Sequence, residues 1–222
     1  MTVTSTTTFN LTISEVIDEA AARVGGQPIL GQEYLSAMRL LDLILTDWAN
    51  RDIALYTLEV SQVTLSVSTT TYSLDSDTQD ILGAVLRVSN TDTRLTRLSH
   101  QEWLNITDKG RTGRPTQFFI DKQRDNPVLY VNPLPTSTTS IFKYWRIRMT
   151  KDSNRLSATP DVHRRYLPAL VSGLAYYIAL RRPSVSMETK ALLKAEYEEM
   201  LDRALEEDRD RATFRAKPRL RL

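Results

Sequence analysis

Four carboxylates of this sequence are of a type that could support hydrolysis. Asp75, Asp77 and Asp80 cluster after an apolar run, and Glu102 is the strongest single candidate because it stands beside Trp103. Two acids about 5 to 10 Å apart across a sugar site, one with a raised pKa, can cleave a glycosidic bond. Cell-wall hydrolysis is therefore one interpretation of the middle of the chain.

Ordinary structural roles compete with each of these candidates. Turn-forming aspartates cluster in the same way as those at 75–80, and a divalent ion there would lack the spacing of a known binding loop. Ser99 and Glu102 have the spacing of a capping box at a helix start. His100 and His163 have no metal-ligand spacing. We therefore expect no catalytic residue, no metal site and no cofactor.

The chain ends in a basic segment that could bind a partner. Beyond Ala212 the helical pattern stops, and four cations follow at alternate positions with no acid among them. In an extended strand alternate residues share a side, so the cations would face one way and the apolar residues the other. Such a segment suits a groove with one acidic and one apolar wall. We predict a docking tail made of Phe214, Arg215, Lys217, Pro218, Arg219, Leu220, Arg221 and Leu222.

Two other interpretations of this tail stay open. Disordered ends are common at chain termini, and the cations could instead contact the phosphates of DNA. Phe214 and Pro218 favour docking on a protein, because an anchor needs apolar area. The net charge of the chain is only +2, so bulk charge argues neither for nor against a nucleic-acid partner.

The apolar periodicity changes character twice along the chain. Residues 13–51 and 160–211 have helical spacing, whereas 55–150 alternate as strands do. Neither helical block can bury its own apolar face, so the simplest fold packs the two helical hairpins as a four-helix bundle. We expect an α+β fold in which a small β-sandwich or barrel is inserted between the hairpins. The predicted domains are 1–54 (first half of the bundle), 55–150 (β domain), 151–211 (second half of the bundle) and 212–222 (extended tail).

Local signals mark the expected helix ends. Thr12 and Glu15 form a capping box before the first helix. The threonine–proline pair at 159–160 is expected to open the third helix. Pro168 is expected to cause a kink or a restart, because proline lacks a backbone donor. Ser184 is expected to cap the last helix.

Composition limits the class of protein further. The 222 residues include no cysteine, so disulfides and thiolate metal sites are excluded, which fits assembly in a reducing cytoplasm. The uncharged helical stretch at 166–180 is shorter than the roughly 20 residues that span a bilayer. Arg165 and Arg181 flank it, so we expect a buried core helix and no membrane association.

Four stretches of the sequence carry a resemblance to a known family. They are "EYLSAMRLLDLILTDWANR" at 33–51, "TYSLDSDTQDIL" at 71–82, "GRPTQFF" at 113–119 with "NPVLYVNPLP" at 126–135, and "YLPALVSGLAYYIAL" at 166–180. In this order and spacing they resemble the head-to-tail adaptor proteins of short-tailed bacteriophages, called tail tubular protein A or tail accessory factor. The resemblance covers nearly the whole chain.

The resemblance implies a structural virion protein without enzymatic activity. Such adaptors form a ring of twelve subunits below the portal, with helical bundles toward the capsid and β domains toward the tail. The implied partners are the portal protein, bound by the C-terminal tail, a tail nozzle or tail-tube protein, and further copies of the chain. Packaged DNA would pass through the lumen. The implied location is the head–tail junction of the virion, assembled in the host cytoplasm. A tail-associated cell-wall glycosidase and a virion DNA-binding protein are the alternatives.

Overall fold

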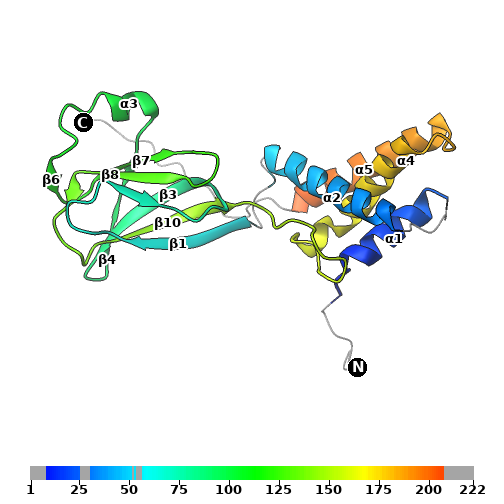
Figure 1. The fold of residues 1–222 in the computed structure, drawn as a ribbon, viewed down its shortest axis with the longest axis horizontal. Helices are drawn as coiled ribbons and strands as arrows, with labels where there is room; N and C mark the ends of the chain where they lie inside the picture. Colours follow the sequence, from blue (N-terminus) through cyan, green and yellow to red (C-terminus); the bar gives the residue numbers. More distant parts are fainter. Residues whose placement is uncertain (1–8, 26–30, 52, 54–56, 208–222) are drawn as a thin grey trace, which may run out of the picture. The chain divides into compact units, whose positions relative to one another are not determined.

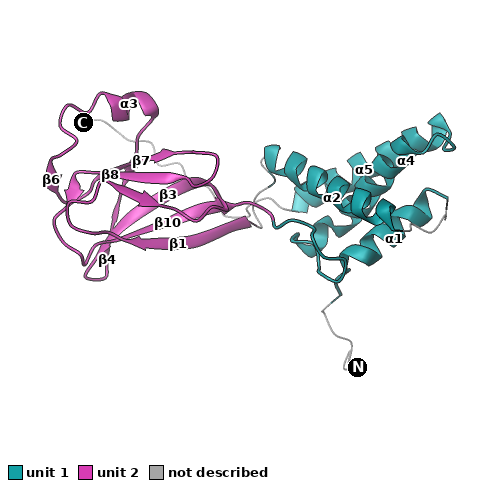
Figure 2. Ribbon diagram, in the orientation of Figure 1, with its two compact units in different colours: residues 1–53, 151–222 teal, residues 54–150 magenta. Residues whose placement is uncertain are grey.

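The chain divides into two compact units in a computed structural model that describes residues 9–25, 31–51, 53 and 57–207. Unit 1 combines residues 1–53 with 151–222 and is helical, whereas unit 2 consists of residues 54–150 and is built mainly of strands (Figure 1, Figure 2). The predicted α+β class is therefore confirmed.

Two helices from the N-terminal part of the chain belong to unit 1, α1 (Ile13–Arg23) and α2 (Gln32–Asn50). The capping box at the start of α1 is confirmed. The Glu15 carboxylate accepts the backbone N–H of Thr12 at 2.7 Å, and the Thr12 hydroxyl accepts the backbone N–H of Glu15 at 3.3 Å. These bonds satisfy donors that every helix start leaves unpaired.

The third helix begins later than the threonine–proline pair at 159–160 predicted, so that expected start is wrong. A short 3-10 turn, η2 (Arg164–Tyr166), capped by His163, leads into α4 (Leu167–Arg181). Pro168 lies in the first turn of α4, where a backbone N–H has no helical partner in any case. A kink or a helix restart was expected at Pro168, and the chain shows a helix start.

The last helix of unit 1, α5 (Met187–Glu207), also begins beyond its predicted cap. Ser186 rather than Ser184 takes this role, because its hydroxyl accepts the backbone N–H of Thr189 at 3.2 Å.

Helix α4 is the element that the other helices of unit 1 share. It contacts α1, α2 and α5 (Figure 2). Its buried residues lie all around the helix rather than on one stripe, as is typical of a helix enclosed by others. They are Leu167, Ala169, Leu170, Val171, Ser172, Gly173, Leu174, Ala175, Ile178 and Ala179.

One buried contact joins three of these helices. Trp48 of α2 is fully buried, and its Nε1 donates to the Tyr197 hydroxyl of α5 at 2.9 Å. The Tyr197 ring lies on Gly173 of α4, where an added Cβ atom would come within 2.8 Å of a ring carbon. Trp48 also packs on Tyr166, with ring centroids 5.6 Å apart. Any side chain at position 173 would therefore push α5 away from α4.

Unit 2 contains two four-stranded sheets and one two-stranded sheet. The first sheet is antiparallel, in the order β1 (Leu58–Thr64), β10 (Ile141–Arg148), β3 (Thr78–Val88) and β4 (Thr91–Arg94). The second has the order β2 (Thr71–Ser73), β8 (Val128–Asn132), β7 (Gln117–Asp121) and β5 (Thr96–Arg97), with β5 parallel to β7. The short strands β6 (Thr112–Gly113) and β9 (Leu134–Pro135) pair in parallel, and α3 (His100–Leu104) lies between β5 and β6 in the chain.

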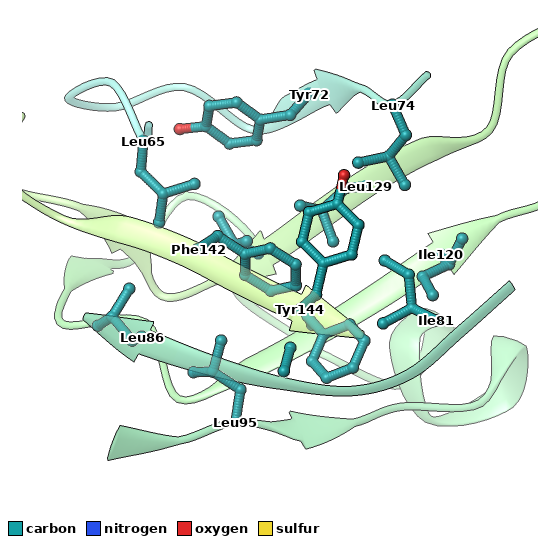
Figure 3. Packing of buried hydrophobic residues seen from close by; sticks show 13 residues of the cluster. Leu65, Tyr72, Leu74, Ile81, Leu86, Leu95, Ile120, Leu129, Phe142 and Tyr144 are labelled. Carbon is teal, nitrogen blue, oxygen red and sulfur yellow. The ribbon is translucent and has the colours of Figure 1, made fainter. Parts of the chain in front are cut away.

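Both four-stranded sheets bury side chains in one cluster (Figure 3). Phe118 of β7 meets Phe142 of β10 nearly edge to face, with ring centroids 5.4 Å apart. Each of these sheets ends in edge strands, so no barrel closes among the described strands, and the barrel alternative is wrong. The cluster consists of Leu65, Tyr72, Leu74, Ile81, Ala84, Leu86, Leu95, Phe118, Ile120, Leu129, Val131, Phe142 and Tyr144.

Replacing Trp48 by alanine should lower the free energy of unfolding by about 3 to 5 kcal/mol, because a buried aromatic side chain leaves a cavity when it is removed. Leu43→Ala is the matched control, since Leu43 lies on the same helix but is 62% exposed. Its effect should stay within about 0.5 kcal/mol. Urea unfolding followed by circular dichroism measures both values. Equal effects of the two substitutions would contradict the central position of Trp48.

A fragment of residues 54–150 should fold cooperatively on its own, because the two four-stranded sheets of unit 2 form their core together. A fragment of residues 1–53 should not, because α1 and α2 each pack against α4. Thermal scans of the two fragments by circular dichroism test this difference. A cooperative transition in the 1–53 fragment would show that these helices do not need α4.

Candidate functional site

Glu102, the strongest catalytic candidate from the sequence, is a capping residue of α3. Its carboxylate accepts the backbone N–H of Ser99 at 2.7 Å, and the Ser99 hydroxyl accepts the backbone N–H of Glu102 at 3.3 Å. The hydrogen bond from the Ser99 backbone holds the pKa of Glu102 below its ordinary value. The general acid of a glycosidase needs a raised pKa, so the shift runs opposite to what sugar cleavage requires.

Arg146 of β10 gathers two of the three clustered aspartates at one end of the first sheet. Its side chain is only 8% exposed. Its Nη1 lies 2.6 Å from the Asp77 carboxylate and 3.1 Å from that of Asp75, and its Nε donates to Glu59 at 2.7 Å. A buried guanidinium without partners is strongly unfavourable. These carboxylates therefore balance the charge of Arg146.

The third aspartate, Asp80, is held by two other cations. Its oxygens lie 2.8 Å from Arg97 and 2.9 Å from Lys122. Burial by itself would raise the pKa of Asp80, but Lys122, the backbone N–H of Ile81 and Arg97 outweigh it and keep that pKa below the ordinary value. Within the described ranges, no group of three or more acidic or histidine side chains is placed to hold a metal ion.

Both histidines have structural contacts. His100 meets the Phe119 ring edge to face, with centroids 4.9 Å apart. His163 caps η2, and its Nδ1 accepts a hydrogen bond from the Arg165 side chain at 3.1 Å. The structure thus brings Asp75 and Asp77 together on Arg146, whereas Asp80 is paired with Arg97 and Lys122. His100 and Glu102 line one pocket beside α3, and His163 lies in the helical unit.

The outer face of the first sheet exposes three apolar side chains, which we call the Trp145 patch: Val60, Leu82 and Trp145, which are 45%, 57% and 53% exposed. Val60 and Trp145 are cross-strand partners, and Gly83 pairs with Trp145 on its other side. A Cβ atom added at Gly83 would have nothing within 4 Å, so space beside the indole is open. Tryptophan is enriched at the energetic centres of protein interfaces, and this patch is therefore a candidate contact surface.

The outer face of the second sheet is covered by α3. Trp103 stacks on Phe119 of β7, with ring centroids 5.6 Å apart and planes inclined by 13°. It also packs against Tyr130 of β8 at a centroid distance of 5.3 Å. Tyr130 is therefore packed under a helix, whereas Trp145 of the first sheet is exposed.

The predicted docking tail lies outside the described residues, which end at Glu207. The Glu207 carbonyl accepts a hydrogen bond from Arg165 Nη1 at 2.8 Å, so the chain continues toward the tail from a point beside η2. The tail residues concerned are Phe214, Arg215, Lys217, Pro218, Arg219, Leu220, Arg221 and Leu222.

A comparison with known families resolves what class of protein carries these features. A family model described as SU10 adaptor protein matches residues 11–220, which include both units. The chain belongs to this family of adaptor proteins. The resemblance to phage head-to-tail adaptors is thereby confirmed. The SU10 adaptor family is one of structural phage proteins and is not a known enzyme family. The search of curated proteins finds no match.

Family membership places the protein in the tail junction of a phage particle and among proteins that associate with portal and tail proteins. Among the described helices, none combines the length and the hydropathy that crossing a bilayer requires.

Arg146→Met should lower the free energy of unfolding by about 1.5 to 3 kcal/mol, the range for hydrogen bonds to charged groups. The reason is that Glu59, Asp75 and Asp77 lose their shared cation. Arg87→Met on the same sheet is the control.

Arg87 forms an ion pair with Asp92 at 2.6 Å, but both side chains are substantially exposed. Its loss should cost about 0 to 1 kcal/mol. Urea unfolding measures both substitutions, and an Arg146 effect no larger than that of Arg87 would show that the buried cluster adds no stability.

Proposed function

We propose that this chain is the repeated subunit of a ring that joins the portal to the tail of a bacteriophage. The ring retains packaged DNA and forms part of the channel through which DNA is ejected. The observation that carries the proposal is the adaptor family match over residues 11–220. The proposed ring has twelve subunits, and its partners are the portal protein and a tail nozzle or tail-tube protein.

In this proposal the two units have separate roles. The helices α1, α2, α4 and α5 form a four-helix bundle that faces the capsid, and the β domain faces the tail. The shared contacts of α4 with the other three helices support the bundle. The chain performs no hydrolysis, which agrees with the lowered pKa of Glu102 and with the pairing of Asp77 to Arg146.

The Trp145 patch supports a contact between neighbouring subunits of the ring. A closed ring of identical subunits uses two different surfaces of each copy, one of which binds the other on the next copy. An exposed tryptophan with open space beside it fits one of these surfaces, because a neighbour can insert a side chain against the indole.

The C-terminal tail is proposed to dock on the portal. Its cations alternate with apolar residues, so an extended tail can present both kinds of side chain at once. Repetition around the ring would strengthen a weak contact through effective concentration.

Deleting residues 213–222 should abolish attachment of the purified protein to portal-bearing heads, as seen by electron microscopy, while the circular dichroism spectrum is retained. Two tail variants separate docking from DNA binding. Replacing the four cations by glutamine, or Phe214, Leu220 and Leu222 by serine, should each prevent attachment, because docking uses both sets of side chains.

If the truncated protein still joins heads and completes infectious particles, the docking proposal is wrong. If it joins heads but the particles lose DNA, the tail is a lumen-facing DNA contact, which corresponds to the DNA-binding alternative. In that case the serine variant should behave as the unaltered chain does, because phosphate contacts depend on the cations.

A further inference from the structure

Unit 1 contains a groove, formed by α1, the start of α4 and the residues just before them, with a volume of about 770 Å³. Its lining has two chemical characters, because α1 supplies acidic side chains and α4 supplies apolar ones. These residues are Glu15, Asp18, Glu19, Leu167, Pro168 and Val171. Helices α1 and α4 pack against each other (Figure 2), and side chains of both line this groove.

The acidic side of this groove keeps negative charge. The Asp18 carboxylate accepts a hydrogen bond from the Tyr34 hydroxyl, a neutral group. The Glu15 carboxylate accepts from the backbone and hydroxyl of Thr12, and the backbone bond is the main reason that the pKa of Glu15 lies below its ordinary value. The carboxylates of Asp18 and Glu15 thus accept these hydrogen bonds from uncharged groups. Glu19 differs, because Arg23 lies 3.7 Å from it.

The two arginines that also line the groove, Arg23 and Arg164, each contact another side chain. Arg23 lies 2.6 Å from Glu196 of α5. The Arg164 guanidinium lies over the Phe9 ring, 5.2 Å from the ring centroid. The groove therefore combines an apolar side, which we call the floor and which Leu167, Pro168 and Val171 line, with an acidic wall supplied by α1. On this wall the Asp18 carboxylate can pair with a cation of a bound segment.

The described chain ends close to this groove. The Glu207 carbonyl at the end of α5 accepts from Arg165, the residue next to the groove-lining Arg164. Residues 208–212 then precede the basic tail, and five residues span at most about 17 Å. The position of the α5 end thus brings the tail within reach of the groove of its own chain.

We propose that residues 213–222 occupy this groove of their own chain while the subunit is free. The odd-numbered cations, Arg215 to Arg221, face the acidic wall, and the even-numbered apolar residues, beginning with Phe214, lie on the floor supplied by α4. The groove is then an intramolecular docking site that competes with any other binder of the tail. If that binder is the portal, as the proposed function has it, the contact withholds the tail until a portal ring is met.

A labelled peptide of residues 213–222 and the chain truncated after residue 212 test the proposal without heads or portal. Fluorescence anisotropy should show saturable binding that weakens as salt rises, because exposed charges are screened. The full-length chain should bind the same peptide about tenfold more weakly, since its own tail competes at a high effective concentration.

Matched variants locate the contact. Asp18→Lys in the truncated chain should weaken peptide binding at least about tenfold, a loss of about 1.4 kcal/mol. Glu198→Lys on the exposed face of α5, which does not line the groove, should leave binding unchanged. A peptide carrying Phe214→Ser should also bind at least about tenfold more weakly, and this variant leaves the fold of the protein untouched.

Four outcomes overturn the proposal directly, and a fifth assigns the groove to another segment. They are no saturable binding to the truncated chain, equal loss with Asp18→Lys and Glu198→Lys, and equal peptide affinity for truncated and full-length chains. The fourth is a full-length chain that sediments as a dimer which truncation converts to a monomer, because the tail would then bind a second copy. If removing residues 1–8, and not the tail, opens the groove to the peptide, the N-terminal segment is the occupant instead. None of these results bears on attachment to heads, so the proposed function is tested separately.

Discussion

The packing of the helical unit depends on the contact between the Tyr197 ring and Gly173. The Tyr197 ring lies against Gly173 of α4, where a Cβ atom would collide with it, and its hydroxyl accepts the indole N–H of Trp48. Trp48 and Tyr197 are 149 residues apart, so this contact fixes α2 against the consecutive helices α4 and α5. A hydrogen bond in a buried setting is costly to leave unmade, so Trp48 and Tyr197 each specify the position of the other.

Local signals predicted local structure well. The capping boxes of Thr12 with Glu15, and of Ser99 with Glu102, form as expected because all of their partners lie within one helical turn. The threonine–proline pair at 159–160 does not begin a helix. Pro168 gives the same sequence signal, and α4 begins beside it, directly after the 3-10 turn that His163 caps. Equivalent signals a few residues apart are separated only by tertiary packing.

The candidate site shows where sequence reasoning stops. Asp77 and Arg146 are 69 residues apart, and nothing in the spacing of the aspartates indicates which cation they will meet. The outward position of Trp145 was within reach, because Phe142 and Tyr144 alternate with it along one strand and face the core. The sequence did not predict the groove of unit 1, although the pattern of the tail indicated the kind of surface that it would fit. A groove forms only when two helices pack, so it depends on tertiary structure. The alternation of the tail can be seen directly in ten consecutive residues.

The insertion of one unit within another has a mechanical consequence. The chain enters the β domain just before β1 and leaves it just after β10, and these strands are antiparallel neighbours whose outermost rung joins Leu58 to Ile147. Tension applied through both connections would therefore peel one hydrogen-bonded rung at a time instead of shearing the whole ladder at once. The next rung, Glu59 with Arg146, carries the ion pair. The buried Arg146 thus strengthens the end of the β1–β10 pair at which the strands would begin to separate.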